Sequence, residues 1–113
     1  MPITNQQVAG HVFLLQMYDD PYFPDRVVDE GKAILRRLCE RIEAEQPSDP
    51  ASLYVLTQAA TEEFNVLDEE FVAAGSGIET VAREWICEEF RFVASAYGFT
   101  SADAEELTAG RDW

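Results

Sequence analysis

The stretch LYVLTQAATEEFNVLDEEFVAA (residues 53–74) decides the fold. Its apolar residues recur every three or four positions, which is the spacing of one face of an α-helix. Asp49 and Pro50 supply the N-cap and first residue of this helix, and Gly75 supplies a left-handed end. At about 1.5 Å per residue the helix is roughly 35 Å long, so we expect an elongated domain. The stripe consists of Leu53, Leu56, Ala60, Phe64, Leu67, Phe71 and Ala74.

Two more helices are predicted on the N-terminal side of this stretch. Apolar residues at helical spacing predict one helix over residues 24–46 and another over residues 5–18. Thr4 and Gln7 have the spacing of a capping box at the start of the earlier helix. The sequence DDPYFP (19–24) separates the two helices, because its prolines lack the amide proton that a helix needs.

A further long helix is predicted on the C-terminal side. Ser76 and Glu79 form a second capping-box pattern, and the apolar residues that follow continue at helical spacing as far as Gly98. The apolar arc of this helix is broad because Trp85 and Phe92 widen it. Such a helix is either central in a bundle or able to form a homodimer interface.

The order of these elements predicts the fold class. A short fifth helix is expected over residues 102–109, and no segment alternates apolar and polar residues as a strand does. Short connections place successive helices side by side in opposite directions. We therefore predict an all-α fold, an antiparallel four-helix bundle with a short fifth C-terminal helix, in which residues 1–113 form a single helical domain.

The charge of the chain restricts its partners. The chain has 8 basic and 22 acidic side chains, a net charge of −14, and residues 42–113 carry sixteen of the acids but three of the bases. A field of this sign repels nucleic acids and anionic membranes and attracts basic proteins. We expect a protein partner of basic character, no direct contact with nucleic acid and no contact with membranes.

A cytoplasmic location is also expected. No stretch approaches the roughly 18 uncharged apolar residues of a membrane span, and the N-terminal sequence lacks the pattern of a secretory signal. Cys39 and Cys87 have no CxxC spacing, and a reducing compartment would leave both as free thiols.

The segment MYDDPYFPD (17–25) is the first candidate binding surface. Rigid aromatic rings flanked by charges are typical of protein contact surfaces. The alternative is that the rings plug the end of the bundle while the aspartates cap the next helix. The candidate partner-binding residues in this segment are Tyr18, Asp19, Asp20, Tyr22 and Phe23.

The glutamates of the two later long helices form the second candidate surface. Carboxylates at positions i and i+4 of a helix lie about 6 Å apart and can imitate phosphates toward a basic partner. The chain would then act as an inhibitor, similar in character to the colicin-type immunity proteins, although it lacks their paired-tyrosine motif. The alternative is that these carboxylates only keep the protein soluble. The candidate residues are Glu62, Glu63, Glu84 and Glu88.

No motif in the sequence predicts catalysis, a cofactor or a metal site. Di-iron sites in helical bundles need Glu-x-x-His motifs, but the single histidine, His11, has no glutamate within ten residues. Nothing near His11 or Cys39 indicates an activated nucleophile, so we interpret His11 as a partly buried structural residue. We expect no catalytic residue and no cofactor, and an enzyme of unidentified class is the least favoured alternative.

The segments MYDDPYFPD (17–25) and VVDEGKAILRRLCERIE (27–43) resemble a family of small acidic bacterial proteins catalogued as a domain of unknown function. The resemblance extends over nearly the whole chain, through Arg111, Asp112 and Trp113. It implies a bacterial, cytoplasmic, helical protein and transfers no activity or site residue. The charge and the lack of catalytic motifs favour a protein-binding or regulatory module.

Overall fold

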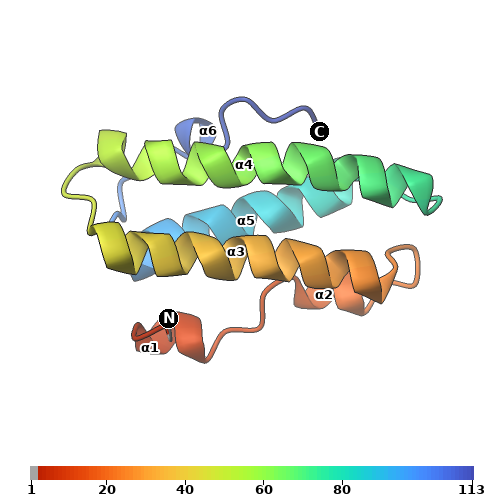
Figure 1. The fold of residues 1–113 in the computed structure, drawn as a ribbon, viewed down its shortest axis with the longest axis horizontal. Coiled ribbons are helices and arrows are strands. Elements are labelled where there is room, and N and C mark those ends of the chain that lie inside the picture. The colour runs from red at the N-terminus through yellow and green to blue at the C-terminus, as the bar shows by residue number, and fades with distance from the viewer. Residues whose placement is uncertain (1–2) are drawn as a thin grey trace.

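The computed structural model describes residues 3–113, and within that range it contains helices and no strands. The all-α prediction is therefore confirmed. The molecule is elongated, as the length of the central helix predicted, with principal extents of 40 × 27 × 20 Å (Figure 1). The helices are α1 (Gln6–Ala9), α2 (Leu15–Tyr18), α3 (Asp25–Glu45), α4 (Pro50–Ala73), α5 (Thr80–Ala96) and α6 (Ala104–Leu107).

Three long helices form the body of the protein. Figure 1 shows α3 and α4 side by side, running in opposite directions, with α5 behind the pair. The short segments 46–49 and 74–79 join them in sequence. The core between the three helices is aromatic at its centre, where the rings of Phe64 and Phe90 lie 5.9 Å apart at their centroids and are fully buried.

Helix α4 has the buried face that its sequence predicted. Asp49 caps it by accepting a hydrogen bond from the Ser52 amide at 2.8 Å, and Pro50 occupies its first turn. Gly75 follows the helix with a φ of +89°, a conformation that glycine adopts without a steric penalty. The buried stripe from Leu53 to Phe71 includes every predicted apolar position between those two residues.

The four-helix bundle is not confirmed, because the helix predicted over residues 5–18 is divided. It consists of two single turns, α1 and α2, separated by a non-helical stretch at residues 10–14. Leu14 has a φ of +61°, and both Leu14 and the adjacent Phe13 are buried. Two consecutive buried side chains diverge by about 100° on a helix, so the break lets both of them enter the core.

The caps at two helix starts also differ from prediction. Asn5, and not Thr4, caps α1, because its side chain accepts hydrogen bonds from the amides of Gln7 and Val8. Helix α5 begins at Thr80, after the predicted capping box at residues 76–79. The preceding residues are held outside the helix because the Ile78 amide donates to the Asp68 carboxylate at 2.7 Å.

The broad apolar arc of α5 is covered in part within the chain. Trp85 packs against Phe23 from the loop before α3, with ring centroids 6.3 Å apart, and Phe92 stacks on His11 at 4.0 Å. The N-terminal segment (residues 3–24) therefore covers the two side chains that suggested a homodimer interface. The dimer itself stays a prediction.

The C-terminal residues pack against α4. Asp103 caps α6, which is shorter than the predicted helix over residues 102–109. Trp113 is buried, with its ring centroid 6.1 Å from that of Phe64. Asn65 on α4 donates to the Gly110 carbonyl at 3.0 Å, so side chains of α4 hold the chain after α6 in place.

The helices of residues 3–113 are too short or too polar to cross a membrane. None of them combines the length and the apolar character that crossing a bilayer requires.

Candidate functional site

Tyr22 is the one aromatic residue among the predicted binding residues that the structure leaves exposed. Its side chain is 45% exposed, although its position is fixed from two sides. Its backbone amide donates to Asp20 Oδ1 at 3.0 Å, and its hydroxyl donates to Glu79 Oε2 at 3.0 Å. The ring also packs edge-on against Phe23, with centroids 5.0 Å apart. An exposed aromatic ring that is already ordered is well suited to contact a partner.

Tyr22 stands at the edge of a hollow of about 460 Å³ between the loop before α3 and the first turn of α5. Val81 contributes an exposed apolar surface there, because its side chain is 55% exposed. We call this region the Tyr22 surface; its residues are Asp20, Tyr22, Phe23, Glu79, Thr80, Val81 and Ala82.

The Tyr22 surface combines a neutral hydroxyl group with two carboxylates. The hydrogen bond to Glu79 raises the pKa of the Tyr22 hydroxyl, and the partial burial and negative charge beside it act in the same direction. The phenol therefore stays neutral at physiological pH. The carboxylates of Asp20 and Glu79 give the surface a negative charge that favours a basic partner.

The other candidates from the loop have different environments. Phe23 is buried and packs edge-on against Phe71 with centroids 5.9 Å apart, as the plug interpretation predicted for both rings. The other part of that interpretation is wrong, because Pro24 and no aspartate occupies the N-cap of α3. Tyr18 donates a hydrogen bond to Asp29, and partial burial, that bond and the nearby carboxylates raise its pKa well above the usual value. Asp19 is exposed. The loop thus divides its aromatic residues between core and surface.

The four candidate glutamates are exposed on two different helices. Glu63 on α4 pairs with Arg37 at 2.8 Å, and Glu88 on α5 approaches Arg91 at 3.7 Å. Glu62 and Glu84 are exposed on the same two helices. Their role in binding a partner stays a prediction.

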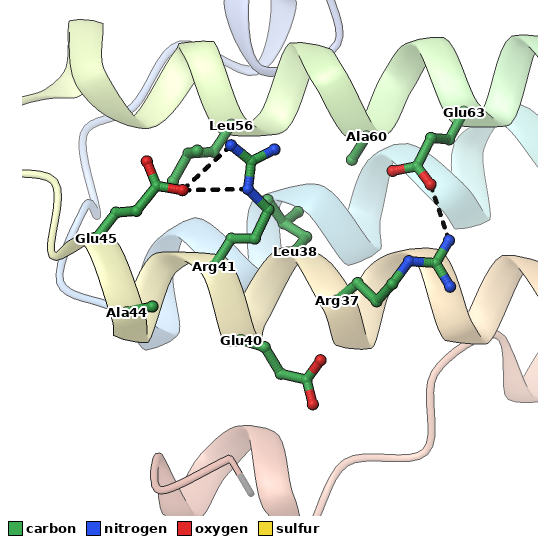
Figure 2. A pocket seen from close by; sticks show the side chains of 9 residues that line it. All are labelled: Arg37, Leu38, Glu40, Arg41, Ala44, Glu45, Leu56, Ala60 and Glu63. Carbon is green, nitrogen blue, oxygen red and sulfur yellow. Dashed lines mark hydrogen bonds and ion pairs between the residues drawn. The ribbon is translucent and has the colours of Figure 1, made fainter. Parts of the chain in front are cut away.

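A second hollowed surface lies along the α3–α4 pair, and Glu63 is the one predicted binding residue that lines it. Figure 2 shows Arg41, Glu45 and Glu63 between the two ribbons, with α5 behind them, whereas Glu40 points away from α4. Arg41 and Glu45 stand on its α3 wall, where the guanidinium and the carboxylate lie 3.1 Å apart. The Arg37–Glu63 ion pair crosses from α3 to α4. We call this surface the α3–α4 groove.

The α3–α4 groove contains two hollows that share Arg37 and Glu63. The Arg41 hollow measures about 340 Å³, and the Glu70 hollow measures about 310 Å³. Besides the shared pair, the Arg41 hollow is lined by Leu38, Glu40, Arg41, Ala44, Glu45, Leu56 and Ala60. The Glu70 hollow is lined by Glu30, Ala33, Ile34, Val66, Leu67 and Glu70.

Comparison with known protein families assigns the chain to one of them. The profile of one family matches residues 7–113, which include the Tyr22 surface and both walls of the groove. The chain belongs to DUF5713, a family of unknown function. No curated protein and no solved structure matches the sequence. The resemblance to a domain of unknown function is thereby confirmed, and membership of DUF5713 assigns no activity.

One buried polar cluster of this DUF5713 protein was not anticipated from the sequence. Glu89 on α5 is 8% exposed, and its carboxylate accepts the Leu14 amide at 2.7 Å and lies 2.8 Å from His11 Nε2. His11 stacks on Phe92. The cluster fastens the break between α1 and α2 to α5, so the interpretation of His11 as a partly buried structural residue fits its surroundings. The chain offers no local signal for this contact, because His11 and Glu89 are 78 positions apart.

The Cys39 thiol is buried and unreactive in the folded DUF5713 chain. It is fully buried on α3, and burial raises its pKa to about 12, although a hydrogen bond with Tyr97 opposes this shift. Its sulfur therefore stays a thiol at physiological pH. Among residues 3–113, no three histidine, cysteine, aspartate or glutamate side chains are grouped so that they could hold a metal ion.

Proposed function

We propose that this DUF5713 protein is a protein-binding module that contacts its partner through the Tyr22 surface. The observation that carries the proposal is the exposed Tyr22 ring, held by hydrogen bonds to Asp20 and Glu79 beside a hollow. A ring fixed before binding loses little conformational entropy when a partner covers it. Val81 supplies apolar area next to the ring.

The partner is a basic protein in this proposal. Asp20 and Glu79 flank the ring, and the whole chain carries a net charge of −14, so a positively charged surface is attracted from a distance. Such steering acts mainly on the association rate and weakens as salt is added. Where the covered surface of the partner is its own working site, binding would inhibit it. The inhibitor alternative drawn from the sequence rested on Glu62, Glu63, Glu84 and Glu88 instead.

The proposal includes a reducing, cytoplasmic compartment. Both Cys39 and Cys87 are free thiols, and Cys39 is packed in the core as a small apolar side chain.

The experiment is affinity capture from the native cell with three forms of the chain. We expect the wild type and Tyr22→Phe to retain the same protein, because both keep the ring, whereas Tyr22→Ala should lose it. Tyr54→Ala removes a half-buried tyrosine elsewhere on the surface and serves as the matched control. With the captured protein purified, the association rate should fall steeply from about 0.05 to 0.5 M salt. Equal capture by the wild type and Tyr22→Ala would refute the proposal.

A further inference from the structure

The α3–α4 groove lies on the side of the α3–α4 pair that α5 leaves open. In Figure 1, α5 lies behind the pair, and the N-terminal segment and α6 lie beside its outer edges. Figure 2 shows the side chains of the Arg41 hollow on the side that faces away from α5. Two antiparallel helices leave a groove on each side of their contact, and here α5 fills one of them. The other groove has the shape that a further helix would occupy.

The apolar lining of the groove includes three alanines among larger aliphatic side chains. Ala44 and Ala60 line the Arg41 hollow, and Ala33 lines the Glu70 hollow. Val66, on the α4 wall of the Glu70 hollow, is 60% exposed. Small residues let an incoming helix approach closely, and an exposed valine gives it apolar area to cover.

The two hollows are spaced like side chains on one face of a helix. Ile34 lines the Glu70 hollow and Arg41 lines the Arg41 hollow, seven residues further along α3. Seven residues of α-helix span about 10 Å, which is two turns. A helix lying along the groove would therefore place side chains i and i+7 in successive hollows, one on each side of the Arg37–Glu63 ion pair.

The charges of the groove select a basic occupant. Glu40 points toward α1 in Figure 2, and the remaining carboxylates of the walls are those of Glu30, Glu45, Glu63 and Glu70, against the guanidinium groups of Arg37 and Arg41. Glu30 and Glu70 line the same hollow from opposite walls, and the interaction with Glu30 raises the pKa of Glu70, because a second negative charge beside the first is disfavoured. A second copy of the chain, with its own charge of −14, would be repelled.

We infer that the α3–α4 groove binds an amphipathic helix of a basic partner protein, which inserts large apolar side chains at i and i+7 into the two hollows and places a lysine or arginine between Glu30 and Glu70. This surface is distinct from the Tyr22 surface, so the inference goes beyond the proposed function and can fail independently of it.

The test uses a synthetic helical peptide of about 18 residues with leucines at i and i+7 and lysines along both edges of the apolar face. A second peptide of identical composition has one leucine moved by one position, which turns it out of line by about 100°. We expect the first peptide to bind the full chain saturably in fluorescence anisotropy, and the second to bind at least about tenfold more weakly. The methyl NMR signals of Ala33, Ala44 and Ala60 should shift with the first peptide.

Matched variants separate the groove from general attraction to an acidic protein. Glu70→Gln should weaken binding roughly three- to tenfold, whereas Glu69→Gln, an equal change of charge on an exposed neighbour outside the groove, should have little effect. Val66→Ser should weaken binding by about tenfold, and Val72→Ser should not, because Val72 is equally exposed on α4 but does not line either hollow. Tyr22→Ala should leave peptide binding unchanged.

Three results would overturn the inference. One is that the two peptides bind equally or not at all. Another is that Glu69→Gln and Glu70→Gln weaken binding to the same extent. The last is a dimer in sedimentation equilibrium that Val66→Ser dissociates and Val72→Ser does not, because the groove would then belong to a second copy of the chain.

Discussion

Replacing Glu89 with alanine tests whether one buried carboxylate fastens the N-terminal segment to the three long helices. In the wild type this carboxylate accepts the Leu14 amide at 2.7 Å and lies 2.8 Å from His11 Nε2. Leu14 is 1% exposed, so water cannot replace the missing acceptor in the folded protein. The segment should then loosen first, because its break at residues 10–14 depends on this contact.

The expected cost follows from the partners left behind. A buried amide without an acceptor costs about 1–3 kcal/mol, and the one methylene lost from the Glu89 side chain adds about 1 kcal/mol. Part of this is offset, because the wild type also pays to bury a carboxylate. We expect Glu89→Ala to lower the free energy of unfolding by about 2–3 kcal/mol, a large share of the roughly 5–15 kcal/mol typical of a domain.

The assay is denaturant unfolding followed by circular dichroism, with hydrogen exchange of the Leu14 amide as a local readout. Glu88→Ala is the control, because the Glu88 side chain is 63% exposed and its ion pair with Arg91 is long at 3.7 Å. The control should stay within about 0.5 kcal/mol of the wild type. The reasoning is refuted if both variants lose the same stability, or if exchange of the Leu14 amide is as slow in Glu89→Ala as in the wild type.

Three further predictions follow from packing and ionisation. Gly31→Ala should destabilise by about 1–3 kcal/mol in thermal unfolding, because the new Cβ would lie 3.0 Å from a Leu14 methyl group and 3.3 Å from the Phe64 ring; a gain in stability would contradict that packing. Burial opposes ionisation of Glu43, but hydrogen bonds from Tyr97 and from the Thr4 and Asn5 groups outweigh it and hold its pKa at about 2, below the usual 4.5. Because the pKa of Glu43 is lower in the folded than in the unfolded chain, its ionised form stabilises the fold above pH 4.5, and this stabilisation is lost as pH falls toward 2. Glu43→Gln should therefore flatten the dependence of the urea midpoint on pH in that window. Cys39 should resist a disulfide reagent at about pH 8 until the chain unfolds, and rapid reaction of the native thiol would disprove its burial.

The long helices were predictable because their determinants are local. The period of α4 and its ends at Pro50 and Gly75 are visible in consecutive residues, and the structure buries the predicted stripe from Leu53 to Phe71. The divided first helix was not predictable from its own sequence. Its break depends on Glu89, which is 75 positions beyond Leu14 and offers no pattern that a local rule could detect.

The two candidate binding surfaces also depend partly on local sequence and partly on contacts between distant residues. The aromatic loop stood out by composition, but only packing decides that Phe23 enters the core while Tyr22 remains exposed. Glu63 was predicted as a binding residue, but the α3–α4 groove as a whole was missed because its walls come from two helices, and its central pair, Arg37 and Glu63, is 26 positions apart. Helical periodicity describes each wall by itself and gives no information on which residues face each other across the gap.

The attachment of the N-terminal segment has a consequence for the order in which the chain assembles during synthesis. The Asn5 side chain donates to the Ala96 carbonyl, 91 positions later, and the Leu14 amide donates to Glu89, 75 positions later. The helical hairpin of α3 and α4 needs only a short loop to close, so it can form while α5 is still in the ribosome. Phe13, fully buried in the finished protein, is translated early, and its ring packs edge-on against that of Phe92 on α5 with centroids 6.1 Å apart. A nascent chain paused before residue 80 would therefore leave the Phe13 ring without this cover and open to chaperones, and release of α5 would restore it.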